Sequence, residues 1–93
     1  MKTNKDYILR EIVGENVLVP TGKAAIEVNG MIHLSETGVF LWKLYDVKEN
    51  LEELVSALMD EFEVDEDTAR RDVYNFSKML LENHMILEVP ELA

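Results

Sequence analysis

The sequence contains no cysteine, which excludes disulfide bonds, thiolate catalysis, iron–sulfur clusters and cysteine-based zinc sites. Only two prolines and four glycines occur in 93 residues, so the chain is neither collagen-like nor low-complexity. No apolar run reaches the roughly 18 residues of a membrane-spanning helix, and the first residues lack the apolar stretch of a signal peptide. We therefore expect a cytoplasmic protein with no membrane partner.

Basic residues are also scarce. Nine Lys and Arg stand against nineteen Asp and Glu, which gives a formal net charge of −10. Such a chain repels phosphate backbones and anionic lipids on average, so a nucleic-acid partner is not expected. Hydrophobic residues make up 47% of the chain, enough for a packed core. At this length we expect a single domain over residues 1–93.

The first third of the chain has the composition of strands. Residues 7–13 are rich in aromatic and β-branched types, and we expect them to form a hairpin with residues 17–19 across Gly14, Glu15 and Asn16. A second hairpin is predicted from residues 24–28 and 31–34, which are joined by Asn29-Gly30.

The remainder has helical periodicity in three segments. Ser35, Asn50 and Asp65 are the expected N-caps, and the helices should run to about residues 46, 62 and 83. Asn50 with Glu53 approximates a capping box. The third helix is expected to bury Ala69, Val73, Phe76 and Leu80, and residues 85–89 form a short apolar end. The fold class is therefore α+β: a small antiparallel hairpin sheet followed by three helices, in a winged-helix-like outline.

No constellation of catalytic or metal-binding residues is visible. The sequence has no Gly-rich phosphate loop, nucleophile elbow or HExxH helix. His33 is expected on a solvated strand face and His84 in the last turn of a helix, where a cation meets the dipole favourably. The acidic stretch from Asp65 fails as a calcium loop, because its sixth and twelfth positions are Arg70 and Phe76 rather than Gly and Glu. We expect no enzyme and no cofactor.

The third helix has a second face, next to the residues that are expected in the core. A step of 100° per residue places Arg70, Tyr74, Ser77 and Leu81 on one flank. This flank is either part of a wide core stripe or one wall of a groove for a peptide. In the second case the floor would be an exposed strand edge, and the pattern leaves open which strand that is.

Two stretches resemble a known family. Residues 7–22 (YILREIVGENVLVPTG) and 29–46 (NGMIHLSETGVFLWKLYD) are similar to the pyrroloquinoline quinone biosynthesis protein D family, the PqqD-like peptide chaperones or RiPP recognition elements. The family signature L-N-E-T-G/A…W is matched by Leu34, Glu36, Thr37, Gly38 and Trp42. Ser35 replaces the usual Asn, which exchanges one good N-cap for another. Residues 51–86 also follow the family pattern.

The resemblance implies a winged-helix-like domain that binds the leader of a ribosomally made precursor peptide as an added strand. It further implies that the domain presents the leader to a modifying enzyme, commonly a radical-SAM maturase. Whether the product is pyrroloquinoline quinone or another modified peptide stays open, as does the oligomeric state. The residues that the resemblance places at the peptide are Met31, Ile32 and His33 on a strand edge, and Arg70, Tyr74, Ser77, Lys78 and Leu81 on the third helix.

The alternative is a winged-helix DNA-binding transcription regulator. Such a helix presents its first residues to bases and phosphates. Here these residues are Asp65, Glu66 and Asp67, which would repel a polyanion. The charge at this helix start therefore favours the peptide binder over the regulator.

Overall fold

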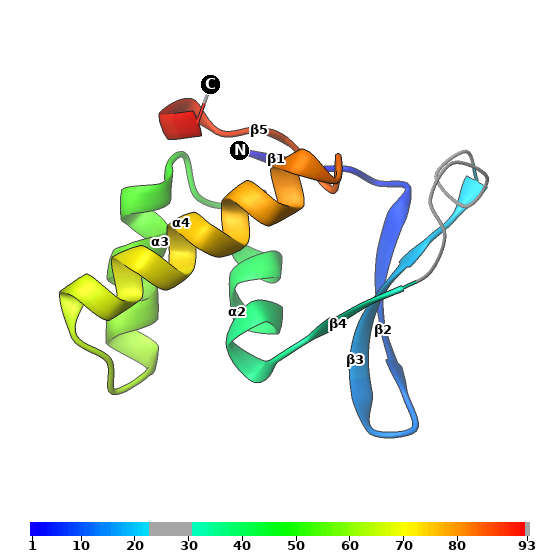
Figure 1. Ribbon diagram of the computed structural model, residues 1–93, viewed down its shortest axis with the longest axis horizontal. Coiled ribbons are helices and arrows are strands. Elements are labelled where there is room, and N and C mark those ends of the chain that lie inside the picture. Colours follow the sequence, from blue (N-terminus) through cyan, green and yellow to red (C-terminus); the bar gives the residue numbers. More distant parts are fainter. Residues whose placement is uncertain (23–30, 93) are drawn as a thin grey trace.

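The computed structural model describes residues 1–22 and 31–92 and has an α+β fold, as the sequence predicts. Strands β2 (Tyr7–Ile12), β3 (Glu15–Pro20) and β4 (Ile32–Leu34) form an antiparallel sheet in the order β2-β3-β4. Helices α2 (Glu36–Leu44), α3 (Leu51–Glu61) and α4 (Glu66–Glu82) follow. In Figure 1 the sheet stands beside the helices, with α4 crossing in front of α2 and α3.

The first hairpin is present, but its turn is tighter than predicted. The ladder continues to the pair Ile12↔Glu15, so the turn consists of Val13 and Gly14 rather than of residues 14–16. Both residues have positive φ, 50° and 79°. A two-residue turn needs such angles to match the right-handed twist of the two strands that it joins. Valine is a poor residue for this conformation, which is why the composition did not place the turn there.

The second predicted hairpin is only partly described. Its first strand, residues 24–28, and its Asn29-Gly30 turn lie outside the described residues. The other strand is present as β4, which pairs with β3 through Asn16↔Leu34, Val17↔His33 and Leu18↔Ile32.

The three predicted N-caps are confirmed. The side chains of Ser35, Asn50 and Asp65 each accept a hydrogen bond from the backbone N–H three residues further on, at 3.1, 3.0 and 2.8 Å. The expected capping box is incomplete, because the Glu53 carboxylate accepts from the N–H of Glu49 rather than from that of the cap residue. Each helix therefore begins where a short polar side chain satisfies one of its free N–H groups.

A second, smaller sheet joins the two ends of the described chain. Strand β1 (Lys2–Thr3) pairs antiparallel with β5 (Ile86–Glu88). Strand β5 lies within residues 85–89, the short apolar end expected from the sequence. Figure 1 shows this pair beside the last turn of α4. Asp46, just after α2, accepts from the Thr3 N–H at 2.9 Å, the Thr3 hydroxyl at 2.7 Å and Lys5 at 2.6 Å.

One hydrophobic core lies between the helices and reaches the inner face of the three-stranded sheet. Its largest fully buried members include Tyr45, Leu18, Leu41, Leu51, Leu54, Leu58 and Leu80. Glu91, in a short 3₁₀ turn (Pro90–Leu92), accepts from the N–H groups of Leu51 and Glu52 and so covers the start of α3. Among the described residues, no helix is long and apolar enough to cross a membrane.

Candidate functional site: the edge of β4 and the sides of α4

Strand β4 is the end strand of its sheet. It bonds to β3 on one side, and within residues 1–22 and 31–92 no strand pairs with its other edge. Met31 and His33 are exposed, whereas Ile32 is half-buried against the core. The His33 Nδ1 lies 3.2 Å from Glu15 Oε2, on the outward face of the sheet. The segment predicted for peptide contact is thus an edge with backbone groups available on one side.

Arg70 and Tyr74 lie on the side of α4 that faces α3. The Arg70 guanidinium contacts Glu52 at 2.5 Å and Glu66 at 2.8 Å, and the Tyr74 hydroxyl donates to Glu52 at 2.9 Å. Hydrogen bonds from Arg70 and then Tyr74 lower the pKa of Glu52. The same contacts with Glu52 and Glu66 raise the pKa of Arg70. The polar groups on this side are bonded to one another and stand away from β4.

Ser77, predicted to line the groove, is fully buried instead. Its hydroxyl lies 2.6 Å from the Tyr45 hydroxyl. Burial, opposed by this hydrogen bond, raises the pKa of Tyr45 to about 12. Phe76, predicted to be core, is only half-buried. The core stripe of α4 thus contains Ser77, because its buried hydroxyl is satisfied by Tyr45, the residue that follows α2, and Phe76 packs at the margin of the core.

Leu81 and Lys78, the other two residues of α4 that were expected to contact the peptide, lie in two further places. Leu81 lines a pocket of about 350 Å³ together with Leu87, Glu88, Val89 and Pro90, on the side of β5. Lys78 is exposed. The five predicted residues of α4 are therefore divided among the α3 side, the interior, the β5 side and solvent, and they do not form one wall facing β4.

The side of α4 that does reach the end of β4 carries Asp72 and Phe76. Both line a pocket of about 230 Å³, whose other lining residues are Ser35, Thr37, Gly38 and Leu41. A Cβ placed on Gly38 would lie 3.5 Å from the Phe76 Cζ and 3.5 Å from the Leu34 Cβ, so this ring and the last residue of the strand both lie close to Gly38. Sequence reasoning missed this pair, although the four-residue spacing places them on one helix face.

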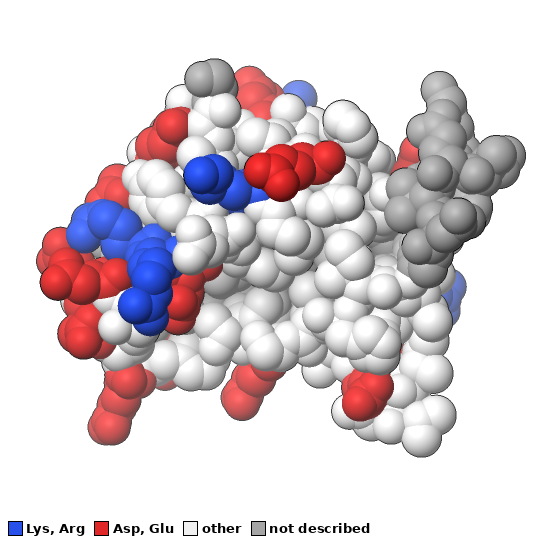
Figure 2. Space-filling model, in the orientation of Figure 1, with Lys and Arg blue, Asp and Glu red and all other residues white. Residues whose placement is uncertain are grey.

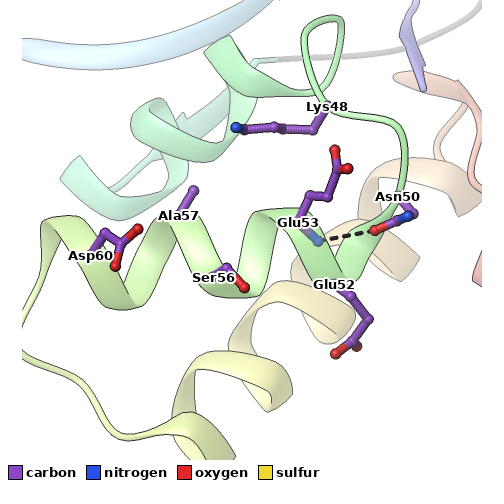
Figure 3. Close-up of a pocket in the computed structure, with 7 residues that line it drawn as sticks. All are labelled: Lys48, Asn50, Glu52, Glu53, Ser56, Ala57 and Asp60. Carbon is purple, nitrogen blue, oxygen red and sulfur yellow. Dashed lines mark hydrogen bonds between the residues drawn. The ribbon is translucent and has the colours of Figure 1, made fainter.

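A further pocket lies away from the strand edge, along α3. It has a volume of about 550 Å³ and is lined by Lys48, Asn50, Glu52, Glu53, Ser56, Ala57 and Asp60. Figure 3 shows the Lys48 side chain extending above this face and the Asn50 side chain directed at the Glu53 nitrogen. In the part of the chain that the structure describes, no group of three His, Asp or Glu side chains could hold a metal ion.

Charged side chains are unevenly distributed between the α3–α4 end of the molecule and the surface between α4 and the three-stranded sheet. Figure 2 shows acidic and basic side chains crowded at the end of the molecule where α3 passes into α4. The surface that this view presents between α4 and the three-stranded sheet is largely uncharged. An uncharged surface beside an open strand edge favours contact with a polypeptide backbone over contact with a phosphate backbone.

Comparison with protein families gives a match over residues 15–86 to the family described as Coenzyme PQQ synthesis protein D (PqqD). This chain belongs to the PqqD family. The match begins at β3 and ends at β5, so it includes β4, α2 and α4. A search of curated proteins gives no match.

Among solved structures, this PqqD family member is similar to TbiB1 in complex with the TbiA(beta) leader peptide. The TM-score is 0.72 at 25% sequence identity, over 94% of this chain and 95% of the other. The resemblance that the sequence suggested, both in family and in fold, is confirmed by these two findings.

Proposed function

We propose that this PqqD family member is a non-enzymatic peptide chaperone, which binds the leader of a ribosomally made precursor peptide. The observation that carries the proposal is the edge of β4 that no described strand pairs with, beside the Asp72–Phe76 side of α4. Membership of the PqqD family supports it, and so does the similarity to TbiB1, which was solved with a leader peptide.

The leader adds to the sheet as a further strand along β4. Alternate residues of a strand direct their N–H and C=O groups to the same side, so part of Met31 to Leu34 can bond to an added chain. Each such bond contributes about 0.5–1.5 kcal/mol net, and a ladder this short therefore needs side-chain contacts as well. Phe76 and the pocket beside it supply an apolar contact, which fixes the register of the leader.

The bound leader is then presented to a modifying enzyme, which we propose is a radical-SAM maturase in the cytoplasm. The chain supplies a binding surface to this reaction and no catalytic group. Nucleic acid is disfavoured as a partner because Asp65, Glu66 and Asp67 are exposed at the start of α4.

The test is calorimetry with the leader of the precursor peptide encoded beside this gene, together with amide exchange on the protein. Saturable binding should protect amides in residues 31–34, and a proline at the paired leader position should weaken binding far more than alanine there. Absence of leader binding, with salt-sensitive binding to duplex DNA, would favour the transcription regulator. Leader binding without protection in this segment would contradict strand addition.

A further inference from the structure

The pocket between α2 and α4 has the size of a site for one side chain. Its volume of about 230 Å³ is below the roughly 300–1,000 Å³ of pockets that enclose small-molecule ligands. It opens next to Ser35, the residue that directly follows β4. A chain added along β4 therefore passes this opening and can place one side chain in it.

The inner part of this pocket is apolar and its outer part is acidic. Leu41 is buried, Phe76 is half-buried, and Gly38 has no side chain, which leaves the space open. Asp72 is the acidic residue among the lining residues, and its side chain is 48% exposed. This combination suits a long side chain with an apolar stem and a polar end that donates hydrogen bonds.

The Asp72 carboxylate has no hydrogen-bond donor among the described residues, and neither do Asp67 and Glu82 on the same helix; of these three acids, Asp72 is the one that lines this pocket. The cation nearest to it, the Nε of Arg71, is 3.7 Å from Oδ1, beyond hydrogen-bond distance. Glu52, by contrast, is bonded to Arg70 and Tyr74, and Asp65 accepts from the Thr68 N–H. Asp72, whose contact with the exposed Arg71 is this long, can therefore form a closer pair with a cation from outside.

The start of α2 does not oppose a cation at this position. A helix N-terminus carries a partial positive charge, but the Ser35 hydroxyl accepts from the Gly38 N–H and Glu36 adds a negative charge in the first turn. The net charge of −10 also favours a basic segment over an acidic one.

We propose that this pocket is a specificity subsite for a lysine or arginine of the leader peptide. The stem of that residue packs against Phe76 and Leu41, and its charged end pairs with Asp72. This inference rests on the proposed function, and it adds the chemistry by which one leader is distinguished from another.

The experiment is a double-mutant cycle by calorimetry with the same leader. Each Lys or Arg of the leader is replaced in turn by norleucine, which keeps the stem and removes the charge. The protein is used as wild type, as Asp72→Asn, as Asp72→Glu, and as Asp60→Asn, which removes the same charge from an exposed site on α3. Thermal melts of all variants check that they fold.

We expect one norleucine substitution to weaken binding to the wild type by up to about fivefold, the upper end of the range of an exposed ion pair. The same substitution should have no effect on binding to Asp72→Asn. Asp72→Glu should retain most of the discrimination, and Asp60→Asn should behave as wild type.

The outcomes separate this inference from the proposed function. If the leader does not bind the wild type at all, the proposed function fails and the subsite with it. If the leader binds but contains no basic residue, or if every norleucine effect is equal in wild type and Asp72→Asn, the leader-binding function stands and the subsite is wrong.

Discussion

The two sides of α4 differ in how their polar groups are bonded. Towards α3, Arg70 and Tyr74 both bond to Glu52 and so link the two helices. Towards β4, Asp72 has no hydrogen-bond donor among the described residues and Phe76 is half-exposed. The comparison teaches that a charged or aromatic residue of α4 is a better candidate for leader contact where the described residues leave it without a hydrogen bond or only half covered.

The largest expected effect comes from Phe76→Ala. If the β4 side binds the leader, losing this ring should weaken binding about ten- to hundredfold, as the loss of an aromatic anchor does. Calorimetry with the leader measures it. Tyr74→Ala is the matched control on the α3 side and should leave affinity nearly unchanged. The reverse result would show that the α3 side binds the leader.

Ser77→Ala tests the assignment of Ser77 to the interior. It leaves the buried Tyr45 hydroxyl without its partner and should destabilise the fold by about 1–3 kcal/mol, measured by urea unfolding. The double variant Tyr45→Phe/Ser77→Ala should recover much of this loss, because both polar groups are then removed. Leader affinity of the folded Ser77→Ala protein should equal that of wild type. A stable Ser77→Ala protein with weakened binding would restore Ser77 to the groove.

Gly38→Ala should change stability and binding in opposite directions. Alanine is favoured over glycine within a helix by roughly 0.5–1 kcal/mol, and the added methyl group would meet its neighbours at ordinary contact distances of 3.5 Å. The melting temperature should therefore rise. The same methyl group occupies part of the pocket beside β4, so leader affinity should fall. Unchanged affinity would mean that no leader side chain enters this pocket.

The bonds on the α3 side should each contribute little, because Glu52 and Arg70 are partly exposed. Tyr74→Phe removes the hydroxyl that donates to Glu52 and should cost less than about 1 kcal/mol of unfolding free energy, with no change in leader binding. Urea unfolding in low and high salt measures it. A much larger loss would show that the hydrogen bond between Tyr74 and Glu52 stabilises the fold more than an exposed contact does.

The smallest effect compares two aspartates, Asp46, which accepts several hydrogen bonds, and Asp72, which accepts none among the described residues. Burial opposes ionisation of Asp46, but hydrogen bonds from Lys5 and Thr3 outweigh it and lower its pKa from 3.8 to about 2. Because the folded pKa is below the unfolded one, the resulting stability is complete above pH 4 and disappears as the pH falls towards 2. Solvent screening limits it to about 1 kcal/mol or less.

Melting temperatures of Asp46→Asn and wild type from pH 7 to 2 test the effect expected for Asp46, with Asp72→Asn at pH 7 as the control. Asp46→Asn should be less stable than wild type at neutral pH and should approach it at low pH. Asp72→Asn should be nearly as stable as wild type at neutral pH, because the Asp72 carboxylate accepts no hydrogen bond among the described residues. Equal stability of the two variants at neutral pH would remove the distinction between the two carboxylates.

Local signals in the sequence were sufficient for most elements and for the family, because caps, periodicity and the Leu34–Trp42 signature all depend on neighbouring residues. The groove wall depended on contacts between distant segments. A helical wheel cannot tell whether Ser77 or Phe76 is fully buried, since the answer depends on Tyr45, the residue after α2, as a hydroxyl partner. It likewise cannot show that Glu52 on α3 engages Arg70 and Tyr74. Strand β1, only two residues long, has no periodicity to detect.

The small sheet of β1 and β5 has a consequence for the protein under mechanical tension. Because Met1 and Glu91 are nearer the two ends than Lys2 and Glu88, force applied to the ends would first load the bond from Met1 to Lys48 and the bonds from the start of α3 to Glu91. The strands are antiparallel with Lys2 opposite Glu88, so that pair and then Thr3↔Ile86 would open next, one after another as in peeling. The bonds between Thr3 and Asp46 would resist last. Contacts near the start of α3, rather than the strand ladder, would thus set the force at which this domain begins to unravel.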